Sequence, residues 1–169
     1  MFELRRCRRS DRAHFDFYCG LSQDVGLAIR ESRKRHLPAD DAALHICISH
    51  KRRKLISHDK QIIFSKGKPC ILIPEGDDPK FKLCVGTPLI GCSTNGDFTN
   101  GARYMVLSLG EKIRLQDTWT KREFEASVDA IRKQTQLAWA VVYQKVQGCT
   151  EEGTVMLHDL SSRYLERSH

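Results

Sequence analysis

Three apolar runs, each ended by polar residues, predict the strands of an α/β sheet in this chain. The run at 44–49 alternates little, as is typical of a strand buried on both faces of a parallel sheet. The run at 140–143 is rich in β-branched and aromatic residues and predicts a second buried strand, and the run at 153–160 predicts a third. Apolar residues at helical spacing predict helices within 15–29 and 119–131.

Residues 61–116 have a different pattern, in which short β-rich runs alternate with turn residues. The runs lie at 62–64, 70–73, 88–92, 103–107 and 112–115. Between them are glycine-rich turns, including Asn100-Gly101, and the Asn-Gly pair is the strongest short signal for a hairpin turn. Strands at this spacing predict a small antiparallel barrel or meander.

The strand at 140–143 ends in the polar segment Gln-Lys-Val-Gln-Gly-Cys-Thr at 144–150. In α/β folds, ligands bind where strands end at the sheet edge. Lys145 offers a point charge for phosphate and Gln147 offers a bidentate amide. Gly148 permits close backbone approach, and Thr150 adds a hydroxyl. On the residues alone, a ligand-binding turn and a polar surface turn both remain open.

The chain is basic, and its basic residues include one uninterrupted run. Net charge is +7 over 169 residues, which favours an acidic partner such as nucleic acid. The strand at 44–49 leads through Ser49 and His50 into Lys51, Arg52, Arg53 and Lys54. Three interpretations remain open for this run: a solvated helix face, a phosphate-binding surface or a nuclear-import signal. The strand before it favours phosphate contact.

The seven cysteines include no Cys-x-x-Cys pair, and the seven histidines form no metal-ligand spacing with them. We therefore expect no metal site, reduced thiols and an intracellular protein that is not secreted. No apolar stretch is long enough to cross a bilayer, and no signal-peptide pattern occurs, so no membrane is expected. The sequence also has no Gly-x-x-x-x-Gly-Lys-Ser/Thr loop, so this chain alone is not expected to hydrolyse ATP.

The segment at 144–150 resembles motif V of superfamily 1B DNA helicases, the RecD-like and Pif-like enzymes, whose usual form is His-Lys-Ser-Gln-Gly-x-Thr after an apolar strand. Gln144 replaces the usual histidine and Val146 replaces the usual serine. Four positions match that form: Lys145, Gln147, Gly148 and Thr150. In the family this motif couples the nucleotide cleft to the bound strand, and the resemblance implies that role here.

Other landmarks of the family occur in the same order. Gly86, Pro88, Asn100 and Gly101 match a small Src-homology-like barrel that the family inserts into its second motor domain. Ser49-His50 partly matches the end of a strand that leads to a DNA-contacting helix. Near the N-terminus, Leu4, Arg9, Asp11 and Phe15 match a leucine, an arginine and a following helix. The resemblance implies that Arg9 reaches the γ-phosphate of ATP, with Arg8 as the competing candidate.

The resemblance implies an α/β fold, a partial RecA-like parallel sheet with an inserted small antiparallel β-barrel. Residues 1–60 would begin the second RecA-like motor domain, 61–116 would form the barrel, and 117–169 would return to the motor domain. The chain would be the C-terminal portion of an ATP-dependent 5′-3′ DNA helicase, located in the nucleus or at sites of DNA replication. ATP and Mg²⁺ would act only in the intact enzyme, with an N-terminal RecA-like ATPase half upstream or on another chain.

The partner would be single-stranded DNA, with RNA possible, and the nucleic-acid-binding residues would be Ser49, His50, Lys51, Arg52, Arg53, Lys54 and Asn100. Two alternatives remain. One is a stand-alone, non-catalytic nucleic-acid-binding module derived from a helicase half. The other is a scaffolding fragment, which predicts no salt-sensitive DNA binding.

Overall fold

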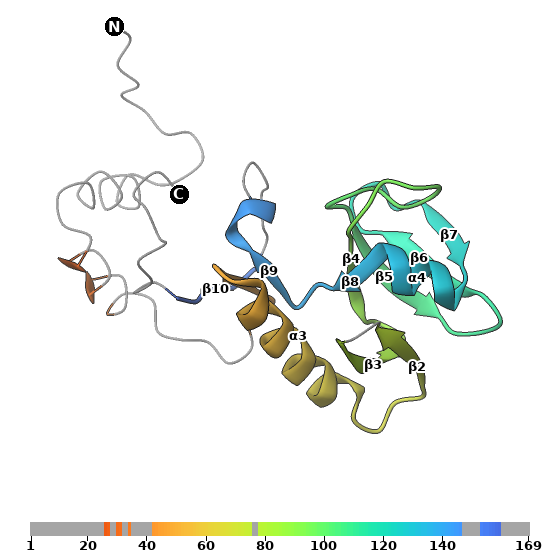
Figure 1. The fold of residues 1–169 in the computed structure, drawn as a ribbon, viewed down its shortest axis with the longest axis horizontal. Coiled ribbons are helices and arrows are strands. Elements are labelled where there is room, and N and C mark those ends of the chain that lie inside the picture. The colour runs from red at the N-terminus through yellow and green to blue at the C-terminus, as the bar shows by residue number, and fades with distance from the viewer. Residues whose placement is uncertain are drawn as a thin grey trace, which may run out of the picture. The chain divides into compact units, whose positions relative to one another are not determined.

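The computed structural model describes residues 42–75, 78–146 and 153–159, together with five helical positions between 26 and 34. The chain divides into two compact units, and Asp41–Asp159 forms one of them. All helices and strands given below belong to that unit, and Figure 1 labels most of them.

A three-stranded parallel sheet contains the three predicted apolar runs. Its strands are β1 (Leu44–Cys47), β9 (Ala140–Val142) and β10 (Val155–Leu157), in the order β10-β1-β9. Every residue of β1 and β9 is buried. The expected parallel strands are therefore confirmed. The pairing of β1 with β10 sets His45 opposite Met156, so it joins parts of the chain that are far apart in sequence.

Helix α3 (His50–Ser65) follows β1 and packs against β1 and β9. It begins at the N-cap Ser49, whose hydroxyl accepts a hydrogen bond from the Arg52 amide at 3.1 Å. The buried face of α3 is polar and repeats every four residues: Arg53, Ser57, Gln61 and Ser65. Ser57 Oγ accepts a hydrogen bond from the Ala140 amide at 3.1 Å, which joins the helix to β9.

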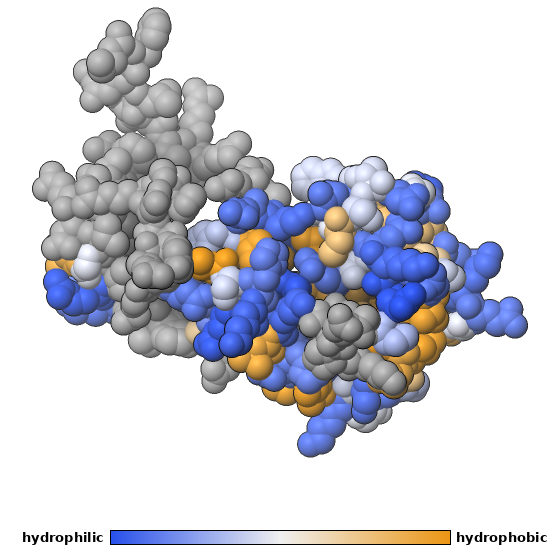
Figure 2. Space-filling view, in the orientation of Figure 1, coloured by the Kyte–Doolittle hydropathy of each residue, from blue (hydrophilic) through white to orange (hydrophobic). Residues whose placement is uncertain are grey.

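The opposite side of α3 carries apolar residues in water. Leu55, Ile62 and Ile63 are more than half exposed. At the place that α3 occupies in Figure 1, Figure 2 shows orange, apolar patches among blue, hydrophilic surface. The sequence analysis expected 62–64 to be a strand, and that is wrong, because these residues form the last turn of α3.

Antiparallel strands occupy the middle of the chain and form two sheets. The first sheet pairs β2 (Cys70–Glu75) with β3 (Asp78–Cys84). The second has the order β7-β6-β5-β4-β8, with the bounds β4 Pro88–Gly91, β5 Arg103–Ser108, β6 Ile113–Asp117, β7 Glu123–Ala126 and β8 Thr135–Leu137. The short helix α4 (Val128–Gln134) lies between β7 and β8. The fold is therefore mixed α/β, with one parallel sheet and two antiparallel sheets.

The two antiparallel sheets enclose one core. Ile73 and Leu83 from the first sheet lie fully buried with Leu89, Ile113 and Leu115 from the second. A smaller core lies at the parallel sheet and includes Ile90 of β4, so the parallel and antiparallel parts share packing. Hydrogen bonding among the described strands leaves the two sheets separate. The antiparallel strands are therefore present as predicted, but the inserted small barrel is not confirmed.

The antiparallel elements also run beyond residue 116, where the sequence analysis ended them. Strand β7 and helix α4 occupy the stretch in which one helix was expected, and β8 pairs with β4. Only Val128 and Ile131 of the four apolar residues at helical spacing lie in that helix, because Phe124 is a strand residue and Trp119 lies in a turn. The division at 1–60, 61–116 and 117–169 stays a prediction.

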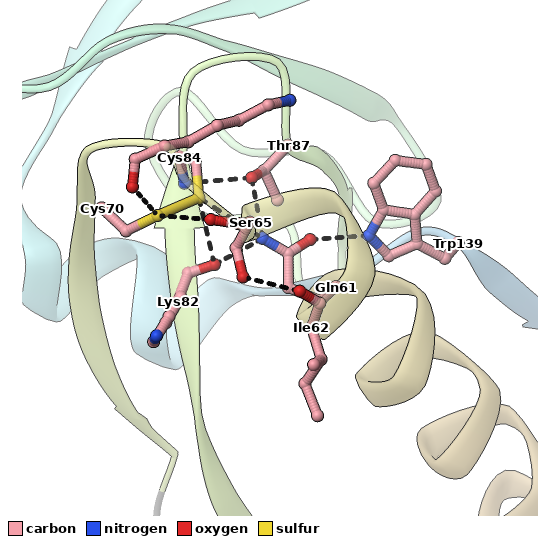
Figure 3. Close-up of a disulfide and its surroundings, with 9 residues drawn as sticks. Gln61, Ile62, Ser65, Cys70, Lys82, Cys84, Thr87 and Trp139 are labelled. Carbon is pink, nitrogen blue, oxygen red and sulfur yellow. Dashed lines mark hydrogen bonds between the residues drawn. A yellow bond between two sulfur atoms is a disulfide. The ribbon is translucent and has the colours of Figure 1, made fainter.

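A buried glutamine joins α3 to both antiparallel sheets (Figure 3). Gln61 Nε2 donates to Thr87 Oγ1 at 3.1 Å and to the Lys82 carbonyl, and Gln61 Oε1 accepts from Trp139 Nε1 at 2.7 Å. Trp139 also packs on the larger core and against Phe64, with ring centroids 5.0 Å apart. Trp139 is thus a structural residue.

Beside Gln61, the structure joins Cys70 and Cys84 in a disulfide (Figure 3). These cysteines are the first residue of β2 and the last of β3, and strand pairing places them opposite each other. The expectation that all thiols are reduced is wrong for this pair. Spacing along the chain did not reveal it, because the hairpin and not a short motif brings the two residues together.

Candidate nucleic-acid interface

The three parallel strands end at one edge of their sheet, and the segments that follow them collect the candidate binding residues. Strand β1 leads into Ser49 and α3, β9 leads into the 3₁₀ turn η1 (Tyr143–Lys145), and β10 leads into His158 and Asp159. Register pairs Cys47 with Val142, so α3 and η1 begin side by side. This is the edge at which α/β folds bind ligands.

The first turns of α3 concentrate positive charge at this edge. Lys51, Arg52 and Lys54 are exposed, and the first turn contains no acidic residue. A helix N-terminus carries a partial positive charge, so lysine and arginine side chains in the first turn are electrostatically unfavourable by themselves. A bound anion would offset this repulsion. A helix start that carries exposed basic side chains suits phosphate.

Arg53 differs from its three basic neighbours, because only 5% of it is exposed. It begins the polar face that α3 turns towards the protein, four residues before Ser57. The basic run therefore divides, with Lys51, Arg52 and Lys54 on the surface and Arg53 inside. We keep the prediction of phosphate contact for the three exposed residues, together with the exposed His50. Ser49 has its hydroxyl engaged as the N-cap.

Lys145, at the end of η1, connects this edge to the antiparallel part. Its Nζ donates a hydrogen bond to Asn100 Oδ1 at 2.6 Å. Asn100 lies in the loop between β4 and β5, beside Gly101 at φ +83°. The loop approaches β4 so closely that a Cβ on Gly91 would lie 2.1 Å from the Thr99 carbonyl oxygen. The structure therefore brings two predicted site residues, 45 positions apart, into contact.

A pair of histidines lies behind the basic edge and was not anticipated from the sequence. His45 Nδ1 and His158 Nε2 are 2.9 Å apart, and the rings stack with centroids 5.1 Å apart. Burial is the main cause that lowers the pKa of His45 to about 4, with Lys60 and His158 adding to it. Burial, and then Arg52, also lower the pKa of His158, while Asp159 opposes them. Both rings are therefore neutral at pH 7.

Asp159 completes this edge with a carboxylate. Its Oδ2 accepts a hydrogen bond from the Ile48 amide at 3.3 Å, which fixes the connection between β1 and α3. The histidine pair and Asp159 had no signal in the sequence, because His45 and His158 meet only through the parallel pairing of β1 with β10. They hold the edge in place, and the exposed basic residues are its candidate contacts for a ligand.

Several predicted site residues lie outside the described part of the chain. These are Arg9 and three of the four motif V matches: Gln147, Gly148 and Thr150. Within the described ranges, no group of three or more His, Cys, Asp or Glu could hold a metal ion. In the same ranges, no helix is long and apolar enough to cross a membrane.

No family model and no curated protein matches the sequence. Among solved structures, the chain is similar to one described as the crystal structure of Bacteroides sp Pif1 in complex with ADP-AlF4. The identity is 18% and the TM-score is 0.43, and the match covers 90% of this chain. It spans 44% of the Pif1 chain, less than half its length. A likeness of this size does not establish a shared fold.

Proposed function

We propose that this chain grips single-stranded DNA at the carboxyl edge of its parallel sheet, as the C-terminal portion of an ATP-dependent 5′-3′ DNA helicase. One observation carries the proposal. Exposed basic side chains on the first turns of α3 lie beside η1, whose Lys145 is held by Asn100. The resemblance to motif V supports it, since Lys145 is one of the four matching residues.

The proposed contacts are mainly to phosphates. Lys51, Arg52, Lys54 and Lys145 supply positive charge, and the positive end of the α3 dipole lies at the same edge. Phosphate contacts release counterions, so affinity should fall steeply with salt and depend little on base sequence. RNA offers the same phosphates, and oligouridylate would bind by the same contacts if the site ignores the sugar.

In the proposed intact enzyme, ATP and Mg²⁺ would be held chiefly by an N-terminal RecA-like half, with Arg9 of this chain directed to the γ-phosphate. An arginine suits that role because it stays charged and binds phosphate oxygens in pairs. The nucleotide supplies the energy for stepping. The described residues of this chain bind the strand and relay movement of η1 to α3 through the adjacent strands β9 and β1.

A salt series tests this function. Binding of a fluorescent oligothymidylate of about 12 nucleotides would be measured by anisotropy between roughly 50 and 200 mM salt. Lys51→Ala and Lys145→Ala should each weaken binding and reduce the slope of log K against log salt by about 0.7. Lys66→Ala is the matched control, because Lys66 is exposed at the other end of α3, about 24 Å away.

Equal losses in Lys51→Ala and Lys66→Ala would mean that binding follows net charge and not this edge. Absence of binding at low salt would refute strand gripping by this chain. Catalysis by this chain alone is not part of the proposal. ATP hydrolysis should remain at background until the N-terminal half is supplied.

A further inference from the structure

Trp119 is a large aromatic side chain that the fold leaves in water. It lies in the turn between β6 and β7 and is 89% exposed, the largest exposed fraction among the exposed large apolar residues of the described part. The other tryptophan, Trp139, packs on the core and bonds to Gln61. Isolated exposed apolar residues are ordinary. A role for Trp119 therefore has to be argued from its place in the fold and from the contacts that hold its turn.

The turn that carries Trp119 is held from both sides. Asp117 Oδ1 accepts hydrogen bonds from the Trp119 amide at 2.8 Å and the Thr120 amide at 2.9 Å. The backbone of Asp117 bonds to Lys121 and Arg122 at 3.0 and 2.9 Å, which closes the turn. Lys121 adopts the left-handed conformation at φ +61°. The indole is therefore carried on a fixed backbone, which suits a stacking surface because little order is lost on binding.

Packed aromatic rings support the strands on either side of that turn. Phe98, Tyr104 and Phe124 meet edge to face, with centroids 5.3 to 5.5 Å apart. The Tyr104 hydroxyl also accepts a hydrogen bond from the Thr99 amide at 2.7 Å. This cluster joins the β4–β5 loop to β5 and β7. The loop and the β6–β7 turn therefore form one rigid end of the antiparallel sheet.

The same loop connects Trp119 to the basic edge. Asp97, in the loop, forms an ion pair with Arg122, three residues after Trp119. Asn100, three residues further along the loop, bonds to Lys145. Two contacts thus connect Lys145 at the parallel-sheet edge, through the β4–β5 loop, to the turn that carries Trp119.

Carboxylates at this end are already engaged by donors. Asp97 is paired with Arg122, and Asp117 accepts the two turn amides. Glu123 lies 4.0 Å from Arg114 and accepts a hydrogen bond from Gln116. Lys121 is exposed beside Trp119. A nucleic-acid strand that approaches Trp119 meets little uncompensated negative charge.

We propose that Trp119 is a stacking platform for an unpaired nucleobase of the strand whose phosphates bind at the parallel-sheet edge. This inference rests on the proposed function and adds a second kind of contact to it. Every base has a π-face, so such a platform adds affinity without reading sequence. It also makes the proposed binding surface for the strand longer than the phosphate site alone.

The test uses the full chain with Trp119→Ala and Trp119→Phe. Trp119→Ala should raise the Kd for oligothymidylate about tenfold, as removal of a stacking aromatic does, and Trp119→Phe should retain most of the affinity. The salt slope should not change in either variant, because no phosphate contact is removed. Tryptophan fluorescence should be quenched by the oligonucleotide in the natural protein and scarcely in Trp119→Phe, where only Trp139 remains.

An abasic oligonucleotide of equal length separates base stacking from other roles of Trp119. It keeps the phosphates, so the natural protein should bind it about as weakly as Trp119→Ala binds oligothymidylate, and Trp119→Ala should not distinguish the two ligands. If the natural protein binds with the expected salt slope but Trp119→Ala binds equally well, the platform is refuted and the phosphate site stands. If the natural protein binds no oligonucleotide, both proposals fail.

Discussion

Lys145 Nζ donates a hydrogen bond to Asn100 Oδ1 at 2.6 Å, and this contact joins the turn after β9 to the loop between β4 and β5. The two residues were predicted as site residues for different reasons. Lys145 lies in the polar segment after a buried strand, and Asn100 lies in the β-rich middle of the chain. Their contact fixes the direction of a flexible lysine that would otherwise sample many rotamers at the sheet edge.

The first prediction concerns this pair. Asn100→Ala should weaken oligothymidylate binding less than Lys145→Ala, because it releases the lysine without removing the charge. The double variant should bind no more weakly than Lys145→Ala, since Asn100 acts through Lys145. Anisotropy titrations of the four proteins give the double-mutant cycle. Additive losses would show that Asn100 contacts the ligand independently.

The second prediction concerns Gln61. Gln61→Leu should lower the free energy of unfolding by about 2 to 4 kcal/mol, because Thr87 and Trp139 would lose a buried partner. Urea unfolding followed by circular dichroism measures the change. Ile63→Ala is the control on the same helix, since Ile63 is 71% exposed and its loss should stay within about 0.5 kcal/mol. Equal effects in both variants would contradict the assigned role of Gln61.

The third prediction is a loss of stability in acid. The pKa of His45 is lowered from 6.5 to about 4, so between these pH values the unfolded chain binds a proton that the folded chain does not. The contribution of His45 to the free energy of unfolding is therefore fully present above pH 6.5. It falls by up to about 3 kcal/mol as the pH approaches 4.

Unfolding in urea at several pH values measures this fall. In His45→Gln the fall in the free energy of unfolding between pH 6.5 and 4 should be smaller, because the glutamine amide does not titrate. His158 should add to the fall in the natural protein, since its pKa is lowered as well. An identical fall in the natural protein and in His45→Gln would refute the assignment.

The fourth prediction concerns thiol chemistry. Burial raises the pKa of the Cys47 thiol to about 11, so Cys47 should resist alkylation at pH 8, while the exposed Cys92 should react. Cys70 and Cys84 should become labelled only after reduction. Peptide mapping by mass spectrometry after iodoacetamide treatment reads all four positions. Labelling of Cys70 without reductant would contradict the disulfide.

Strands β1 and β9 could be predicted because their apolar runs are buried on both faces, and a local pattern records that directly. Strand β10 was predicted from its apolar run as well, although it is only partly buried. Hydrophobic periodicity did not reveal the extent of helix α3, since its buried face is Arg53, Ser57, Gln61 and Ser65 while Leu55, Ile62 and Ile63 lie in water. Hydrophobic periodicity gives the wrong answer for such a helix. Its buried polar groups are satisfied by partners far along the chain, as Gln61 is by Trp139.

Residues of the candidate site could be identified from the sequence where they stand in a local pattern, but the contacts between them could not. The basic run and Lys145 could be identified, but burial of Arg53 follows from the orientation of α3, which no run of charges reveals. The histidine pair depends on parallel pairing between β1 and β10. The aromatic residue in the β6–β7 turn was assigned to a helix, because Trp119 has the spacing of an apolar face.

Chemical-shift mapping tests the central claim most directly. Amide resonances of the ¹⁵N-labelled protein would be followed during titration with oligothymidylate. The account predicts the largest shifts at residues 49–52 and 143–146, with smaller shifts in the loop at 98–101, and none at 64–68 at the other end of α3. Shifts confined to surfaces away from the parallel-sheet edge, or no shifts at low salt, would contradict it.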